Sequence, residues 1–187
     1  MNSNYKIKEI RMENIKQQIC EQILRDLPEW FEIEKKIKNY IKGVKDKYFL
    51  AAKVDGEAVG FLVTKDQTES TSEIYVLGVK KEFQCRGIGQ ELISVAEKKL
   101  KQEGKKFLTV KTLGRSRADE NYEQTRKFYQ QVGFHSLEEF TELWDEENPC
   151  LFMVKDLTKL GRNQEIKPSL EEHLRQLEES LLKPEVR

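Results

Sequence analysis

Hydrophobic and polar residues alternate over residues 5–10, which predicts a short first strand. From residue 14 to residue 27 the apolar positions repeat about every four residues, which is the spacing of an amphipathic helix. Pro28 breaks that pattern, and a second helical pattern runs through Ile41. The first part of the chain therefore predicts a strand followed by two helices.

The next patterns have the two-residue period of strands. Residues 48–54 and 58–64 are apolar runs separated by Asp55-Gly56-Glu57, and an Asp-Gly pair between such runs is a strong hairpin signal. Another strand is predicted over residues 73–80. Within it Gly78 interrupts the alternation, as a glycine does where a strand bulges or another backbone comes close.

Helices and strands alternate in the second half. A helix over residues 90–100 leads to a strand over 107–110, and a crossover of this kind joins parallel neighbours. A helix from about 119 to 132 precedes two strands near 134–137 and 151–155, which we expect to pair across a long connection. The chain thus predicts an α+β (mixed α/β) fold: a central, mostly antiparallel sheet of about seven strands with one parallel pair and flanking helices.

The last part of the chain has a pattern of its own. Ser169 and Glu172 have capping-box spacing, and four leucines recur at steps of four, three and four residues: Leu170, Leu174, Leu177 and Leu181. We therefore predict a domain over residues 1–160 and a C-terminal helical extension over 161–187. The leucine seam either packs on its own domain or forms a self-association contact, so a homodimer stays open.

Composition narrows the function classes. The chain has 187 residues, with 33 Lys plus Arg against 33 Asp plus Glu, so its formal net charge is zero. It lacks the basic stripe of a nucleic-acid-binding protein and the run of about 20 apolar residues that spans a membrane. Its three cysteines fit no disulfide or metal framework, so we expect a cytoplasmic protein without a metal.

Two glycines, Gly87 and Gly89, lie between a predicted strand and the start of a predicted helix. Unpaired N–H groups and the positive end of the helix dipole meet at such a place, and glycine lets a phosphate approach the main chain. The sequence lacks the Gly-Lys-Ser or Gly-Lys-Thr of a triphosphatase loop and the third glycine of a dinucleotide site. An anion cradle for another ligand is favoured over a plain tight turn with a solvated Arg86.

Gln84, Gly87 and Gly89 fit the pattern Arg or Gln, two residues, Gly, any residue, Gly or Ala. With the strand before it and Phe128 to Phe134 downstream, the chain resembles the GNAT superfamily of acyl-CoA-dependent N-acyltransferases over residues 5–157. The resemblance implies that the strand 73–80 and its parallel neighbour splay apart and admit acetyl-CoA as co-substrate. It implies the following CoA-binding residues: Leu77, Gly78, Val79, Gln84, Cys85, Arg86, Gly87, Ile88, Gly89, Gln90 and Asn121. Asn121 is alternatively a helix cap.

The resemblance also implies direct transfer of an acetyl group to a primary amine in a ternary complex. Tyr129 occupies the position of the family's tyrosine general acid, although it could instead be an aromatic spacer at the sheet edge. Some relatives carry a glutamate base where Thr109 stands here, and a threonine is no base at neutral pH. Glu73 is the substitute we consider, acting through a water, against the alternative of a solvated carboxylate at a strand end.

Four residues are candidates for binding the acceptor: Trp30, Phe31, Tyr122 and Trp144. The first two follow the helix break at Pro28, where core packing is the alternative. Tyr122 replaces a common asparagine of the family and Thr125 a common alanine, whereas Trp144 is expected in the long acidic connection. The acceptor is a small-molecule or protein amine. Because the strand glutamate is missing, a noncatalytic acyl-CoA-binding or scaffold protein remains the alternative function.

Overall fold

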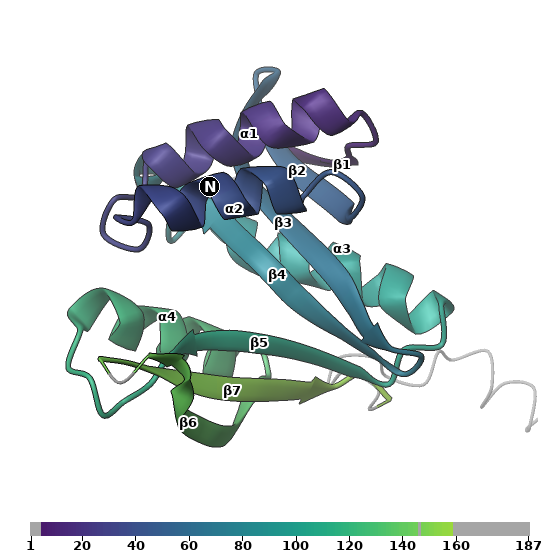
Figure 1. Ribbon diagram of the computed structural model, residues 1–187. Helices are drawn as coiled ribbons and strands as arrows, with labels where there is room; N and C mark the ends of the chain where they lie inside the picture. Colours follow the sequence, from purple (N-terminus) through teal and green to yellow (C-terminus); the bar gives the residue numbers. More distant parts are fainter. Residues whose placement is uncertain (1–4, 146, 159–187) are drawn as a thin grey trace, which may run out of the picture. The chain divides into compact units, whose positions relative to one another are not determined.

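The computed structural model describes residues 5–145 and 147–158, and in this part of the chain seven strands form one sheet in the order β1-β2-β3-β4-β5-β7-β6 (Figure 1). The strands are β1 (Tyr5–Glu9), β2 (Tyr48–Val54), β3 (Glu57–Thr68), β4 (Thr71–Val79), β5 (Phe107–Leu113), β6 (His135–Asp145) and β7 (Asn148–Asp156). The helices are α1 (Glu13–Arg25), α2 (Glu34–Gly43), α3 (Ile88–Gln102) and α4 (Glu120–Gln131). Within these described residues only β4 and β5 pair in parallel, so the predicted α+β fold with a mixed sheet is confirmed.

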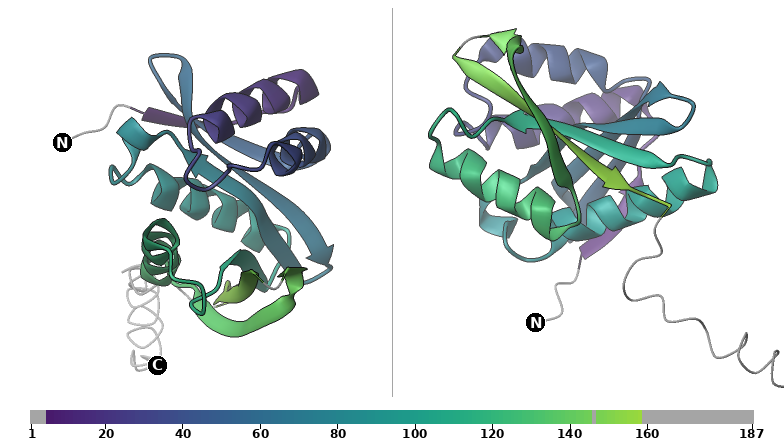
Figure 2. Two further views of the ribbon diagram at one scale, coloured as in Figure 1. Left: turned by 60° about the vertical axis from the view of Figure 1, so that its left-hand side comes forward. Right: turned by 90° about the horizontal axis from the view of Figure 1, so that it is seen from below.

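The sheet separates two hydrophobic cores (Figure 2). Neighbouring residues of one strand point to opposite faces, so Phe49 of β2 packs with α1 and α2 whereas Leu50 packs with α3. The same division separates Phe61 from Leu62 on β3. Each helix pair buries its apolar stripe on its own face of the sheet, which explains the period-four spacing in the sequence.

The hairpin predicted at Asp55-Gly56 is confirmed. Val54 pairs with Glu57, so the turn has two residues, and both have positive φ, 49° for Asp55 and 91° for Gly56. Asp-Gly supports this conformation, because glycine adopts it without steric cost and aspartate tolerates it.

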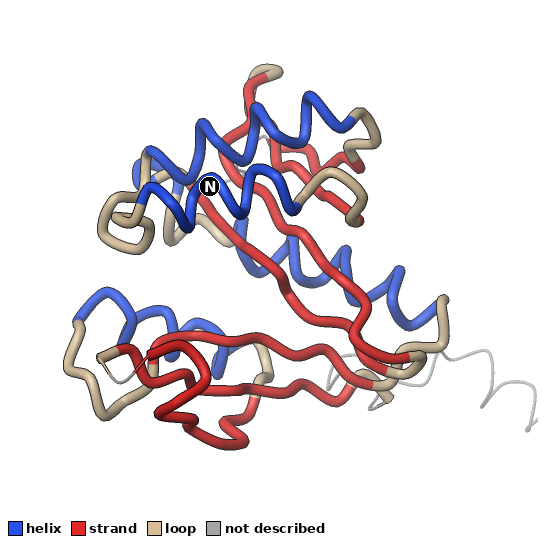
Figure 3. The backbone as a smooth tube through the Cα atoms, viewed as in Figure 1, coloured by secondary structure: helices blue, strands red, loops and turns tan. Residues whose placement is uncertain are grey.

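The parallel pair is short. β4 and β5 pair from Thr71 with Phe107 to Ile74 with Val110, and beyond that point β4 continues to Val79 without β5 beside it. We call the region beyond Ile74 and Val110 the splay, and the two strands diverge there in Figure 3.

A bulge lies where the splay begins. Ile74 of β4 pairs with Thr64 and Val76 pairs with Val63, so Tyr75 is the extra residue. The bulge expected at Gly78 is therefore misplaced, since Gly78 pairs in regular register with Phe61. Gly78 instead makes room for α1: a Cβ there would lie 3.1 Å from the Cγ2 atom of Ile23.

The long connection expected between the last two strands is wrong. β6 runs to Asp145 and β7 begins at Asn148, so Trp144 lies in a strand. β6 is the edge strand, and all its residues from His135 to Trp144 except Glu139 are exposed. Because no core face was present, no alternation marked this strand in the sequence. The predicted helix over 161–187 and the boundary at residue 160 lie outside the described residues.

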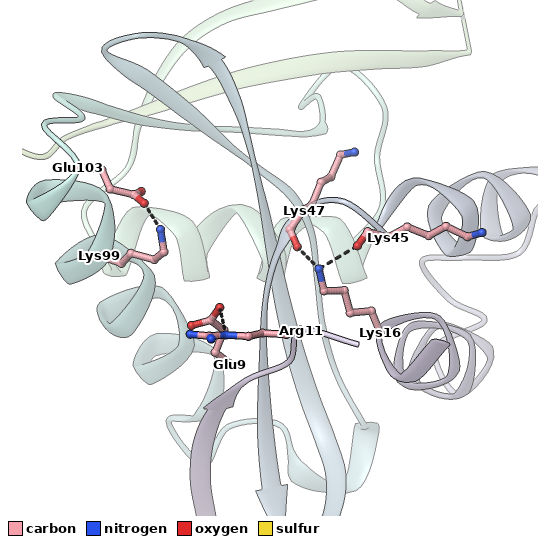
Figure 4. Close-up of polar contacts among 7 residues, drawn as sticks. All are labelled: Glu9, Arg11, Lys16, Lys45, Lys47, Lys99 and Glu103. Carbon is pink, nitrogen blue, oxygen red and sulfur yellow. Dashed lines mark hydrogen bonds and ion pairs between the residues drawn. The ribbon is translucent and has the colours of Figure 1, made fainter. Parts of the chain in front are cut away.

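A buried lysine fixes the connection between α2 and β2. The Nζ atom of Lys16, on α1, donates to the carbonyl oxygens of Lys45 and Lys47 at 2.9 and 2.6 Å (Figure 4). Only 6% of Lys16 is exposed, so these carbonyls replace the water its ammonium group has lost. The turn after α2 is thereby held on α1.

Tyr75, the bulged residue, packs against the end of α2. A Cβ at Gly43, the last residue of that helix, would lie 2.3 Å from the Oη atom of Tyr75. The ring of Tyr40 meets that of Tyr75 edge-on, with centroids 5.3 Å apart. Gly43 therefore lets α2 approach the bulge closely.

We predict that Gly43→Ala lowers the free energy of unfolding by about 1–2 kcal/mol, because the new methyl group overlaps the Tyr75 hydroxyl. In a Tyr75→Phe background, which lacks that oxygen but keeps ring carbons 3.0 and 3.3 Å from the added Cβ, the same substitution should cost clearly less. Urea unfolding of the four proteins measures the difference. Equal losses in both backgrounds would contradict the prediction.

Candidate active site

The loop before α3 has the conformation of an anion cradle. Gly87, the N-cap of α3, and Cys85 both have positive φ, 82° and 57°. The first hydrogen bond of the helix runs from the N–H of Glu91 to the carbonyl of Gly87 at 3.0 Å. Among the described residues no protein group accepts from the N–H groups of residues 85–90. These donors lie at the positive end of the dipole of α3, and together they suit a pyrophosphate group.

The cradle is tied to β4. The Nε2 atom of Gln84 donates to the carbonyl oxygen of Val79, the last residue of β4, at 3.0 Å. The guanidinium of Arg86 lies over the ring of Phe83 at 5.1 Å. Gly89 has a packing role, since a Cβ there would lie 3.1 Å from the ring of Phe128 on α4. The cradle therefore lies at the end of β4.

The edge of β4 that faces the splay has no partner strand among the described residues. The N–H of Lys80 donates to Val59 of β3 at 2.9 Å, so the main-chain groups of Leu77 and Val79 face the other way. The pairing with β5 ends at Ile74, and the Val79 carbonyl already accepts from Gln84. An extended amide chain fits here as an added strand.

Tyr129 is buried on α4. Only 6% of the residue is exposed, and its ring meets those of Phe128 and Phe134 at centroid distances of 5.3 and 5.4 Å. Burial raises the pKa of Tyr129 above its ordinary value, and the nearby Tyr40 and Tyr122 raise it further. The phenol therefore keeps its proton at neutral pH and is able to donate it. The ring also fills space, as the spacer alternative expected.

Glu73 lies on β4 opposite Thr109, at the base of the splay. Its side chain is 8% exposed; one oxygen accepts from Lys111 at 2.7 Å and from Gln67, and the other lies 3.7 Å from Lys65. It is not the solvated carboxylate of the alternative interpretation. Any base role requires a water to reach it past these lysines.

A cavity of about 500 Å³ lies beside α2 and the α1–α2 connection and brings the four expected acceptor residues together. Its lining residues are Glu29, Trp30, Phe31, Glu32, Ile33, Lys36, Asn39, Tyr40, Tyr75, Leu113, Arg117, Asp119, Tyr122, Leu143, Trp144 and Asn148. Tyr40 and Tyr75 were missed by the sequence analysis, although the interrupted strand pattern near Tyr75 was a usable signal. The lining includes six aromatic residues, three carboxylates and two cationic side chains. The aromatic residues suit an apolar body, and the excess of carboxylates suits a cationic amine.

Trp30 joins the two sides of the splay. Its indole Nε1–H donates to the Oγ1 of Thr125 at 3.1 Å, and its carbonyl accepts from the hydroxyl of Tyr122 at 3.2 Å. Tyr122, Thr125 and Tyr129 are spaced three and four apart along α4, so they share one face of that helix. The two residues that depart from the family pattern thus bind the same tryptophan.

The start of α4 is capped by Asp119, whose side chain accepts from the N–H of Tyr122 at 3.0 Å. Asn121 is therefore not the cap. Its carbonyl accepts from the hydroxyl of Thr125 at 3.0 Å, which extends the hydrogen bonds of Trp30 along the helix.

Two features are absent from the described residues. None of their helices has the length and apolar character needed to cross a bilayer. They contain no group of three or more His, Cys, Asp or Glu side chains placed to hold a metal ion.

Comparison with known proteins places this chain in a family. The acetyltransferase (GNAT) family profile matches residues 14–134. Comparison with curated proteins gives no match. Among solved structures, a GNAT-family protein of Desulfovibrio desulfuricans is 15% identical with a TM-score of 0.71, covering 82% of this chain and 99% of that one.

Two further solved structures with the same fold have coenzyme A or acetyl-CoA bound. An aminoglycoside 6'-N-acetyltransferase complexed with coenzyme A is 19% identical with a TM-score of 0.67, covering 83% of this chain and 99% of that one. A GNAT-family acetyltransferase of Elizabethkingia anophelis with acetyl-CoA bound is 18% identical with a TM-score of 0.60, at the same coverages of 83% and 99%. At these identities the likeness to solved structures extends to the fold alone. Because the family profile matches more than half of its residues, the chain belongs to the acetyltransferase (GNAT) family.

Proposed function

We propose that the protein is an N-acetyltransferase that transfers an acetyl group from acetyl-CoA to a primary amine. The supporting observation is the position of the splay between two features. The N–H donors at the start of α3 lie at one end. The aromatic cavity, which Trp30 joins to α4 by a hydrogen bond, lies at the other. The donors suit the pyrophosphate, the edge of β4 suits the pantetheine amides, and the cavity suits the amine. A cytoplasmic location remains our expectation.

In the proposed reaction the amine nitrogen attacks the thioester carbonyl directly. A C–N bond forms, the C–S bond breaks, and the thiolate takes a proton from Tyr129. The nitrogen releases its second proton as the amide forms, and this proton returns Tyr129 to its neutral form. A lysine-like amine has a pKa near 10.4, so it must first lose a proton. Glu73 is the proposed acceptor of that proton through a water.

A panel of small primary amines and lysine peptides tests this function. The purified protein is incubated with acetyl-CoA and each amine, CoA release is followed, and the products are identified by mass spectrometry. We expect acetylation of one class of amine. Saturable binding of acetyl-CoA with no transfer would favour a noncatalytic acyl-CoA-binding or scaffold protein, a second function that the lysine contacts of Glu73 support.

We predict that Tyr129→Phe lowers kcat about 10²-fold, as expected for loss of a general acid, with little change in acetyl-CoA affinity. The acid acts below its pKa, and burial raises that pKa, so Tyr129 should cause no loss of wild-type activity between pH 7 and 10. Steady-state kinetics over that range measure both effects. Tyr48→Phe, on the distant strand β2, is the control. Full turnover by Tyr129→Phe would remove the acid assignment.

Gly87→Ala should weaken acetyl-CoA binding about tenfold in calorimetry, because the added methyl group keeps the pyrophosphate from the main chain. Gly104→Ala is the matched control, since Gly104 follows the other end of α3 with φ of 79° against 82° at Gly87 and likewise has open space around it. Both substitutions carry similar backbone strain. Equal affinities would place the pyrophosphate elsewhere.

The Trp30 bridge should give a measurable coupling energy. Trp30→Phe and Thr125→Val each remove one partner of the Nε1–Oγ1 bond, and we expect a coupling of about 0.5–1.5 kcal/mol in urea unfolding. Thr112→Val is the control, because the hydroxyl of Thr112 is buried without a partner. The change in the free energy of unfolding caused by Thr112→Val should simply add to that caused by Trp30→Phe. A zero coupling with Thr125→Val would show that the bridge contributes no stability.

A further inference from the structure

The outer edge of β6 has the properties of an interaction surface. β6 ends the strand order, so in the described residues no strand pairs with its outer side. Four of the seven large hydrophobic residues that are exposed in this part of the chain belong to it, with exposed fractions of 63% for Leu137, 37% for Phe140, 50% for Leu143 and 42% for Trp144. An open edge with exposed apolar side chains favours the addition of another strand.

The charge of β6 selects the kind of partner. The strand contains Glu138, Glu139, Glu142 and Asp145, and it has no lysine or arginine. Glu139 is engaged within the chain, since its carboxylate accepts from the N–H groups of Arg115 and Ser116 at 2.9 and 3.2 Å. Glu138 and Glu142 are exposed beside the apolar side chains. The surface thus complements a segment that is both cationic and apolar.

The same charges disfavour a second copy of this chain. A symmetric pair of antiparallel β6 strands centred near Phe140 would place Glu138 of each copy opposite Glu142 of the other. Like charges directly opposite each other across two strands are destabilising. A lysine-containing strand at the same edge would face opposite charges instead.

The surface is continuous with the acceptor cavity. Leu143 and Trp144, at the end of β6, are also lining residues of that cavity. A segment paired along β6 would therefore lead toward the place where the amine is expected. Small amines would use the cavity alone and would leave Leu137 and Phe140 without a role.

We propose that the outer edge of β6 binds an extended, basic polypeptide segment and that this segment carries the acceptor amine. The proposal rests on the proposed N-acetyltransferase function. Main-chain hydrogen bonds to the edge would supply affinity for any extended chain. Contacts with Leu137, Phe140 and the exposed glutamates would select a segment with alternating apolar and cationic residues.

Fluorescence anisotropy of the full chain tests the docking. The probe is a fluorescein-labelled, acetyl-capped peptide of nine alternating Lys and Val residues, compared with a peptide that has Glu in place of Lys. We expect binding of the lysine peptide, at least about tenfold tighter than of the glutamate peptide. Leu137→Ser with Phe140→Ser, and separately Glu138→Lys with Glu142→Lys, should each raise its Kd at least about tenfold.

Met12→Ser with Phe107→Ser is the matched control, because these residues are 63% and 40% exposed but lie outside β6. Its Kd should change less than twofold. Unchanged affinity in both β6 variants, or equal affinity for the two peptides, would overturn the proposal. So would sedimentation that shows a dimer of the wild-type chain and a monomer of the Leu137→Ser, Phe140→Ser variant, because the edge would then bind a second copy.

Transfer is measured separately by mass spectrometry of the same peptide with acetyl-CoA. Acetylated lysines support the proposal in full. Acetylation of small amines without peptide binding refutes the β6 surface and leaves the proposed function intact. Peptide binding without acetylation of any amine would support binding at the β6 edge. It would refute both the assignment of the peptide as acceptor and the proposed function.

Discussion

The end of the β4–β5 pairing at Ile74 and Val110 is the constraint on which the site depends. Parallel strands joined by a helical crossover normally continue side by side, but the extra residue Tyr75 changes the register of β4 at that point. Beyond this point β4 stays paired with β3, and β5 stays paired with β7. Beyond Ile74, the outer edge of β4 is left with main-chain groups that no strand of the described residues satisfies. A polar edge inside a fold is costly unless water or a ligand covers it, which makes the splay the natural place for an amide-bearing chain.

The two ends of the proposed thioester substrate would meet different kinds of surface around the splay. At the start of α3 the donors are main-chain N–H groups aligned by the positive φ angles of Cys85 and Gly87, so a chain of zero net charge is able to hold a diphosphate. On the acceptor side the surface consists of aromatic side chains. The backbone donors require one local conformation, so they are determined by a short stretch of sequence. The cavity requires residues from α2, α4, β4 and β6 to converge, so it depends on the whole fold.

This difference explains which features were predicted from the sequence and which were not. The Asp55-Gly56 hairpin and the loop around Gly87 were recognisable because short-range backbone chemistry determines them. β6 was underestimated because an edge strand exposed on both faces has no hydrophobic period. The bulge was assigned to Gly78 because a glycine is the visible irregularity, yet the extra residue is a tyrosine. The hydrogen bond between Trp30 and Thr125 joins residues 95 positions apart, and no local pattern announces it.

Trp30 also connects the acceptor side to the proposed acid. The splay is joined at its base by the strand pairs and by the contact of Lys111 with Glu73, and beside the cavity by the two hydrogen bonds of Trp30. These bonds attach to Tyr122 and Thr125, which lie about two turns and one turn before Tyr129 on the same face of α4. The α1–α2 connection is therefore hydrogen-bonded to the helix that carries the phenol. Since proton transfer requires contact distances, residues that shape the acceptor cavity would also position the proposed acid.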